Sequence, residues 1–141
     1  MSENSPLNTK SFHPFGDLIG LKFTKLSKGC SQCTLEVVDK LLNPHGVVHG
    51  GVLYSMADTG MGAAAYSNLN KNEICATIEV KINYFKAVRG GNLICETKVI
   101  HQGKKTIALD SEIFNEGIIV AKALGTYSII KIKEHHDIPN D

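Results

Sequence analysis

The chain has 141 residues, of which 43% are hydrophobic, and its formal net charge is +1 at pH 7. This is the size of one domain with enough apolar side chains for its own core. The near-neutral charge gives no sign of a nucleic-acid-binding or membrane-surface protein, and no apolar run reaches the roughly 20 residues that span a bilayer.

Both ends of the chain are polar. Residues 1–11 lack the apolar stretch of a signal peptide, so we expect a flexible arm there and a cytoplasmic protein. Residues 133–141 are expected to form a flexible tail. These boundaries leave residues 12–132 as a single domain.

The first part of this domain predicts a short helix and two strands. Residues 12–19 have a proline near their start and are followed by Gly20, which is typical of a short helix or turn. Residues 21–26 and 31–37 alternate apolar and polar side chains on either side of a Lys28-Gly29 turn. This pattern indicates a pair of antiparallel strands.

Cysteine occurs at positions 30, 33, 75 and 95. Cys30 and Cys33 have the CxxC spacing of half a zinc site or a redox pair. No second CxxC follows, and the segment alternates like a strand. We therefore favour small buried residues with free thiols over a metal or redox site.

Residues 51–67 predict a helix. Apolar and small side chains recur there at spacings of three and four, at Leu53, Met56, Ala57, Gly60, Met61 and Ala64. Because the segment contains no Lys, Arg or Glu, we expect a helix that is buried on all sides. Its one carboxylate is Asp58, and an ionised group in such surroundings is costly unless it has a partner or a function.

The rest of the domain predicts β-structure. Strands are expected over residues 77–84, 93–100, 106–114 and 118–130, with Gly-containing turns between them. Successive strands on short turns indicate an antiparallel sheet. One buried helix and one long meander bury each other only if the sheet curls around the helix, which gives an α+β fold.

The chemistry concentrates in the sixteen residues 43–58. A turn rich in Pro and Gly runs into His49-Gly50-Gly51, directly before the predicted helix. Two glycines at a helix start leave backbone N–H groups that a developing negative oxygen can approach closely. Asp58 follows two turns later. An oxyanion donor, a histidine and a carboxylate in one segment predict acyl chemistry.

The order of these elements resembles the hotdog fold, in which an antiparallel sheet curls around one long helix. Asn43, His49-Gly50-Gly51 and Asp58 together resemble the motif of hotdog acyl-CoA thioesterases of the phenylacetate type. The resemblance covers residues 12–131 and extends to the segment 77–85 and to the Gly-Gly-Asn-Leu sequence near residue 91. It implies an acyl-CoA substrate, a homodimer with edge-to-edge sheets and active sites at the interface, and often a tetramer built as a dimer of dimers. It implies no metal or redox cofactor, since coenzyme A is part of the substrate.

The resemblance also implies roles for single residues. The Gly50 N–H would polarise the thioester carbonyl, and His49 would donate a hydrogen bond near the sulfur or the carbonyl. Asp58 would be a general base for water or a nucleophile that forms an anhydride. Asn43 would hold carbonyl or water, and Thr77 would orient the water if the preceding loop differs by about one residue. Turn formation, helix entry and strand initiation are the structural alternatives for these residues.

Substrate contacts are less specific in the sequence. Cations for the CoA phosphates are expected at predicted turns that the family uses near the CoA entrance, namely Arg89, Lys104 and Lys105, although solvated turn residues look the same. No GxxxxGK[ST] or GxGxxG phosphate loop is present. The acyl group and its thioester are expected beside the helix, among Leu42, Val47, Gly51, Tyr54, Met61 and Phe85.

Three alternatives remain. A metal site formed by His45, His49 and Asp58 is disfavoured, because the two histidines lie in a turn without a supporting spacing. A hotdog dehydratase or hydratase would carry its carboxylate about five residues after the entering glycine, where this chain has Met56. A non-catalytic acyl-CoA-binding protein would have little reason to bury Asp58. The acyl specificity stays open.

Overall fold

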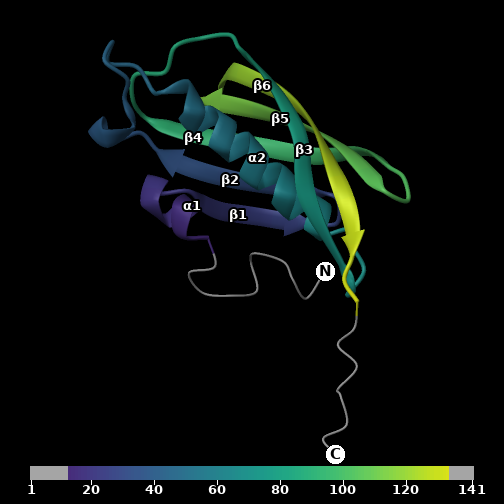
Figure 1. Ribbon diagram of the computed structural model, residues 1–141. Coiled ribbons are helices and arrows are strands. Elements are labelled where there is room, and N and C mark those ends of the chain that lie inside the picture. The colour runs from purple at the N-terminus through teal and green to yellow at the C-terminus, as the bar shows by residue number, and fades with distance from the viewer. Residues whose placement is uncertain (1–12, 134–141) are drawn as a thin grey trace, which may run out of the picture.

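A computed structural model of the protein describes residues 13–133, which form one long helix against a six-stranded sheet (Figure 1). In chain order the elements are α1 (Pro14–Ile19), β1 (Lys22–Ser27), β2 (Cys30–Glu36), the 3-10 turn η1 (Asp39–Leu41), α2 (Gly50–Tyr66), β3 (Glu73–Tyr84), β4 (Asn92–Gln102), β5 (Thr106–Asn115) and β6 (Ile118–Lys131). These bounds confirm the predicted elements to within a few residues, except that β3 begins four residues earlier than expected. No helix in the described part of the chain is both long and apolar enough to cross a bilayer.

The sheet is antiparallel throughout, and its strand order is β1-β2-β4-β5-β6-β3. The expected meander is therefore correct for β4, β5 and β6 but wrong for β3, which pairs with β6 at the far edge. The chain reaches that edge by passing α2 across the sheet between β2 and β3. This crossing leaves β1 and β3 as the two edge strands.

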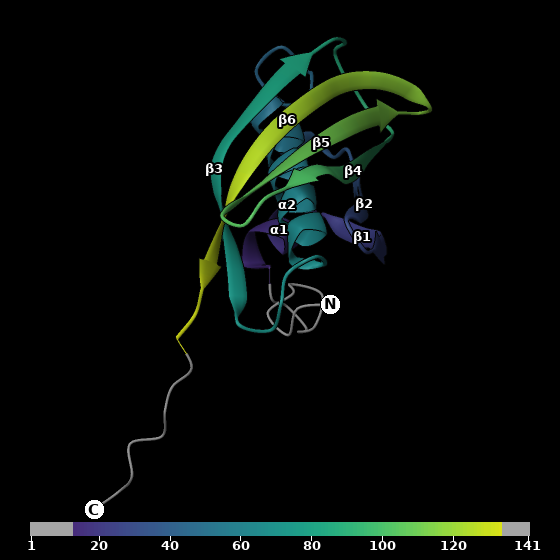
Figure 2. The same ribbon diagram turned by 90° about the vertical axis from the view of Figure 1, so that its right-hand side faces the viewer.

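The sheet curls around α2, as Figure 2 shows most clearly for β3 and β6. Burial alternates along the central strands, as expected for a sheet with one face on the core. The core joins side chains of α2, including Leu53, Met56 and Ala57, to those of the sheet, including Leu35, Leu93, Ile107, Leu109 and Ile113. Each fully buried Leu, Ile or Met contributes about 1.5–3 kcal/mol relative to an exposed one.

The helix α2 is not buried on all sides. The sheet covers one side only, and Tyr54 on the other side is 37% exposed. Residues 55, 58, 59 and 62 are half-buried and lie on one stripe of the helix, since their spacings are three and four. The lack of charged residues other than Asp58 therefore marks a face that is open in the single chain.

The cysteines behave as small strand residues. Cys30 is exposed and Cys33 is buried, because they lie on opposite faces of β2. Cys33 instead lies opposite Cys95 of β4 in the ladder, and both side chains are fully buried. The expectation of a buried residue is correct for Cys33 and wrong for Cys30, and the structure shows no disulfide among the four thiols.

Candidate active site

The first turn of α2 is organised by His49. Its Nδ1 accepts a hydrogen bond from the Gly51 N–H at 2.8 Å and so caps the helix. Because Nδ1 is an acceptor here, the ring proton lies on Nε2. The Gly50 N–H makes no hydrogen bond to any other residue within 13–133, so it is free for a ligand. The helix dipole would reinforce its interaction with a negative oxygen.

Gly50 is also required sterically. The Tyr84 hydroxyl donates to the Gly50 carbonyl at 2.7 Å. A Cβ at position 50 would lie only 3.1 Å from the Tyr84 ring. The glycine therefore permits both the close approach of Tyr84 and access to the amide.

Asn43 shapes the loop before the helix. Its Oδ1 accepts hydrogen bonds from the N–H groups of His45 at 2.9 Å and Val47 at 3.3 Å. The backbone then reverses direction, and Val48 forms an antiparallel β-bridge with Leu42. The structure thus shows the turn-forming role of Asn43, and this residue does not line the cavity at Asp58.

Asp58 lies on the open stripe of α2 and lines a cavity of about 220 Å³. Its Oδ1 accepts a hydrogen bond from Thr77 Oγ1 at 2.8 Å and one from the Tyr127 hydroxyl at 2.5 Å. The structure therefore brings Thr77 to Asp58, whereas the role expected for Thr77, orienting a water, stays a prediction. The other walls of the cavity are His13, Thr59, Gly62, Ala63, Tyr66, Cys75 and Ala76.

A β-bulge in β3 directs Thr77 toward the helix. Thr77 pairs with Tyr127 and Glu79 pairs with Thr126, so Ile78 is an extra residue without a partner in β6. Ile78 is 57% exposed. Bulges are common beside active sites because they re-aim a side chain.

Burial controls the ionisation of the groups around Asp58. Burial, followed by the hydrogen bond to Asp58, raises the pKa of Tyr127 well above its ordinary value. Burial, followed by the charge of Asp58, raises the pKa of the Cys75 thiol to about 12. Both groups are therefore neutral at physiological pH.

The predicted substrate-binding residues lie in separate places. Gly50, Val47 and Phe85 line a cavity of about 310 Å³ at the start of α2, whereas Gly51, His49 and Leu42 line another of about 410 Å³ beside α1. The Tyr54 hydroxyl donates to the carbonyl of Val80 in β3 at 3.4 Å. The prediction for Met61 is wrong: it is 0% exposed and fills the space that Gly125 leaves in the sheet.

The predicted cationic residues lie at opposite ends of the sheet. Arg89 follows Val88, whose carbonyl accepts a hydrogen bond from the Val48 N–H at 2.8 Å, so Arg89 lies near the start of α2. Lys104 and Lys105 lie in the turn after β4, which has eleven residues and a length of roughly 30 Å or more. One protomer therefore does not bring all three cations to one CoA.

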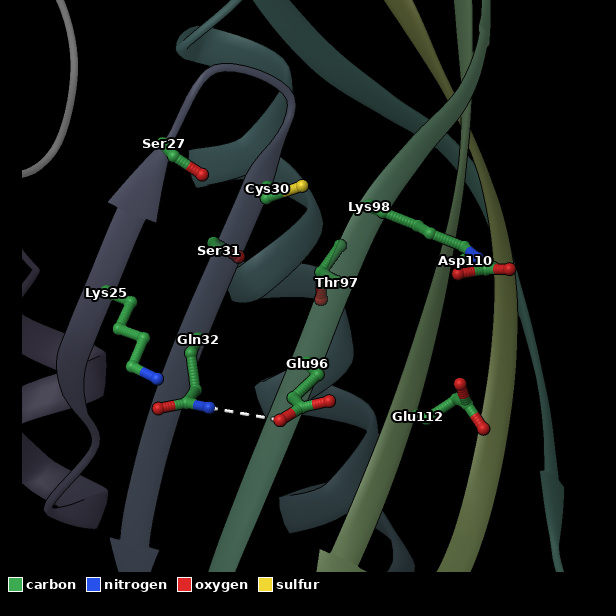
Figure 3. A pocket seen from close by; sticks show the side chains of 10 residues that line it. All are labelled: Lys25, Ser27, Cys30, Ser31, Gln32, Glu96, Thr97, Lys98, Asp110 and Glu112. Atoms are coloured by element: carbon green, nitrogen blue, oxygen red, sulfur yellow. Dashed lines mark hydrogen bonds between the residues drawn. The ribbon is translucent and has the colours of Figure 1, made fainter.

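A further hollow of about 380 Å³ lies on the outer face of the sheet, away from α2 (Figure 3). Figure 3 shows side chains of both charge signs around it, from Lys25, Glu96, Lys98, Asp110 and Glu112, with a hydrogen bond of 3.1 Å from Gln32 to Glu96. None of the predicted site residues lines it. Within residues 13–133 no cluster of three His, Cys, Asp or Glu side chains is arranged to hold a metal ion.

Comparison with known proteins agrees with this architecture. The family model described as the Thioesterase superfamily matches residues 45–122. Protein SSO1253 of Saccharolobus solfataricus is 34% identical over 116 residues, which cover 82% of this chain and 77% of that protein. The acyl-coenzyme A thioesterase PaaI of Escherichia coli is 31% identical over 99 residues, which cover 70% of this chain and 69% of PaaI.

The solved structure of conserved protein PA5202 from Pseudomonas aeruginosa superposes with a TM-score of 0.81 at 33% identity, over 84% of this chain and 94% of PA5202. The chain therefore has the hotdog fold and belongs to the thioesterase superfamily.

Proposed function

We propose that this protein is an acyl-CoA thioesterase, which hydrolyses the thioester of an acyl-CoA to a carboxylic acid and free CoA. The observation that carries the proposal is Asp58, a half-buried carboxylate held by Thr77 and Tyr127 at the wall of a cavity. A carboxylate in a confined site is the group needed to activate water or to attack the thioester. The acyl-CoA thioesterase named among its relatives supports the same substrate class.

The proposed site needs two copies of the chain. Gly50 and Asp58 are eight residues apart on α2, which is about 12 Å along the helix axis. A single thioester carbonyl does not reach the Gly50 amide and the Asp58 carboxylate of the same helix at once. The oxyanion donor and the base that act on one substrate therefore come from different protomers.

The edge strand β3 is the proposed interface. Its twelve residues pair with β6 on one side only, so its other edge is open to a second copy (Figure 1). Exposed apolar side chains lie on or next to it, at Ile78, Tyr84 and Phe85. An antiparallel pairing of two β3 strands would give one continuous sheet across a homodimer.

This pairing also supports the proposed site geometry. Tyr84 near the end of β3 is hydrogen-bonded to Gly50, and Thr77 in its first half is hydrogen-bonded to Asp58. A two-fold axis midway between these two strand positions places Tyr84 of one copy opposite Thr77 of the other. Gly50 of one protomer and Asp58 of its partner then face the same gap. We also expect two such dimers to associate as a tetramer.

The chemistry assigned to each group follows from its contacts. The thioester oxygen would accept a hydrogen bond from the Gly50 N–H, which stabilises the developing negative charge. His49, with its proton on Nε2, would donate to the carbonyl or sulfur. Asp58 would deprotonate the attacking water or attack the carbonyl carbon itself, and Thr77 would fix the carboxylate. This hydrolysis needs no metal or redox cofactor.

The two parts of the substrate would occupy different surroundings. The acyl group would enter the cavity beside Asp58, where Gly62, Ala63 and Ala76 leave room. Its volume of about 220 Å³ suffices for an aromatic ring, since an engineered apolar cavity of about 150 Å³ holds benzene. The CoA phosphates would lie near Arg89 at the start of α2, with Lys104 and Lys105 available only from another protomer. A cytoplasmic location fits this substrate.

Thiol release tests the proposal. Purified protein is assayed with DTNB and a panel of phenylacetyl-, benzoyl-, short- and long-chain CoA esters. The exposed Cys30 is replaced by Ser in all variants, because its thiol would react with the reagent. We expect Asp58→Asn to bind acyl-CoA normally and to lose about 10²–10⁴-fold in kcat, whereas Asp110→Asn on the outer face keeps full activity.

Three results would contradict the proposal. Near-normal hydrolysis by Asp58→Asn would remove Asp58 from the mechanism. Conversion of a crotonyl-type ester to a hydroxyacyl product without thiol release would show a hydratase instead. Tight acyl-CoA binding by the wild type without any reaction would indicate a non-catalytic binding protein.

A further inference from the structure

We infer that Tyr127 is a positioning residue for Asp58: together with Thr77 it fixes Oδ1 of the carboxylate, so that Oδ2 is the oxygen that acts on water or substrate. This inference rests on the proposed function of the site. Tyr127 lies in β6 and is separated from Asp58 by 69 residues of sequence. No motif in the sequence points to it.

The Tyr127 hydroxyl contacts Asp58 at two atoms. Its hydroxyl lies 2.5 Å from Asp58 Oδ1 and 2.7 Å from the Asp58 backbone carbonyl. A hydroxyl has one proton to donate, and a carboxylate is a stronger acceptor than a carbonyl, so the proton points mainly at Oδ1. The ring is 2% exposed and packed in the core, so the position of the hydroxyl is set by the fold.

Thr77 completes the arrangement from the neighbouring strand. It lies directly opposite Tyr127 in the β3–β6 ladder, and its hydroxyl reaches the same Oδ1 at 2.8 Å. Two donors from two strands on one oxygen leave the carboxylate a single orientation. This is the pre-organisation that a catalytic group needs from its surroundings.

The second carboxylate oxygen is left open. Oδ2 has no hydrogen bond to any described residue. Within residues 13–133 Asp58 Oδ2 is not among the buried side-chain oxygens and nitrogens that lack a partner, and Asp58 lines the cavity. An oxygen without a donor is also the more basic of the two.

Tyr127 acts as a permanent donor. Burial and the neighbouring carboxylate raise its pKa, so its hydroxyl keeps its proton at every pH at which the enzyme would work. The other titratable groups that face this cavity are His13 from the segment before α1, Tyr66 from α2 and Cys75 from β3. Burial raises the pKa of Tyr66 and that of Cys75, so these two stay neutral as well. His13 uses its Nδ1 to accept the Gly16 N–H at 2.7 Å.

The test compares Tyr127→Phe with Ser128→Ala. Ser128 is the next residue in β6, and its hydroxyl donates to the Ala76 carbonyl of β3 at 3.2 Å without touching Asp58. We expect Tyr127→Phe to lower kcat about tenfold to a hundredfold with KM within about twofold. The acidic limb of its kcat/KM profile moves to higher pH, because a carboxylate that loses a donor is protonated more easily. Ser128→Ala is expected to change neither kcat nor the acidic limb. The shift of the limb by Tyr127→Phe is also expected when His13→Gln is present in both the variant and the reference protein, because the shift does not come from His13.

A second variant covers the case in which Tyr127→Phe does not fold. Fluorotyrosine at position 127 keeps the ring and makes the hydroxyl a stronger donor, so the acidic limb moves to lower pH. In addition, Tyr127→Phe in the Asp58→Asn background lowers the residual rate by less than twofold, because its effect requires the carboxylate.

The outcomes separate this inference from the proposed function. If the wild type is active and Asp58→Asn is not, the function stands. A folded Tyr127→Phe with unchanged kcat and pH profile then overturns the inference alone. The inference is also overturned if Tyr127→Phe lowers kcat by the same factor in the Asp58→Asn background as in the wild type and neither Tyr127→Phe nor fluorotyrosine shifts the acidic limb. Tyr127 would then have a structural role only. An inactive wild type overturns the function itself.

Discussion

Complementation between two inactive variants tests whether each active site is shared. In the proposed site Gly50 and Asp58 of one chain serve different substrates, because they are about 12 Å apart along α2. Asp58→Asn removes the base. Gly50→Val covers the amide, and its Cβ would lie 3.1 Å from the Tyr84 ring, so the side chain that packs there is displaced as well. Each homodimer is expected to be nearly inactive.

The expected magnitude follows from the composition of the mixed dimer. One of its two sites receives Gly50 from the Asp58→Asn chain and Asp58 from the Gly50→Val chain, so it has the complete wild-type set. The other site carries both changes. A purified heterodimer is therefore expected to have about half of the wild-type kcat, and a random mixture about a quarter.

The assay uses co-expression of the two chains with different affinity tags. Heterodimers are purified over both tags, their mass is measured in solution, and thiol release is followed with the best substrate of the panel. The two homodimers and a wild-type dimer with both tags are the controls. A heterodimer of the correct mass that is no more active than the homodimers would show that each site lies within one chain.

Three further predictions concern single residues. Thr77→Val is expected to lower kcat about tenfold to a hundredfold, since a hydrogen bond to a charged group contributes about 1.5–3 kcal/mol. Thr77→Ser is expected to keep most of the activity, and equal rates for both variants would show that the hydroxyl is not used. Ser111→Ala removes the hydroxyl that lies 2.6 Å from the buried Thr97 hydroxyl, and urea unfolding is expected to show a decrease of about 1–3 kcal/mol in the free energy of unfolding. Thr97→Val in the same chain is expected to restore much of this decrease. A decrease below about 0.5 kcal/mol for Ser111→Ala alone would contradict the prediction. The Cys75 thiol has a pKa of about 12 in the folded protein and an ordinary pKa of 9.0 in the unfolded chain, so the unfolded chain loses this proton at lower pH and the free energy of unfolding falls as pH rises from about 9 to 12. Urea unfolding at several pH values is expected to show a smaller fall for Cys75→Ala than for the wild type. An unchanged pH dependence in this variant would refute the assignment.

Local pattern was enough to predict most of the elements but not the position of β3. Alternation and turn residues are properties of the neighbouring sequence, so the strands and α2 are recognisable from them. The pairing partner of a strand is not encoded in its alternation, and consecutive strands are neighbours only about two-thirds of the time. The lack of charged residues on α2 other than Asp58 predicts a helix buried on all sides, but the sheet of the same chain leaves one stripe of the helix half-buried.

The candidate site is recognisable from the sequence only where its residues are close together in the chain. His49, Gly50 and Asp58 lie in one segment, and their spacing indicates a helix start followed by a carboxylate. Tyr127 joins them only through the tertiary fold. One signal does exist for it: a tyrosine at an inward position of a strand needs a hydrogen-bond partner for its hydroxyl. The partner itself is visible only in three dimensions. The domain boundaries at residues 12 and 132 stay predictions.

The extra residue at position 78 divides β3 into two halves with independent side-chain phase. The first half directs Thr77 toward Asp58, and the second half carries Tyr84 beside Gly50. A shift of one residue in the pairing of either half with β6 would turn the side chains of that half to the other face of the sheet. A protein engineer is therefore free to vary the chemistry of the two halves separately, provided that the chain length between them is kept.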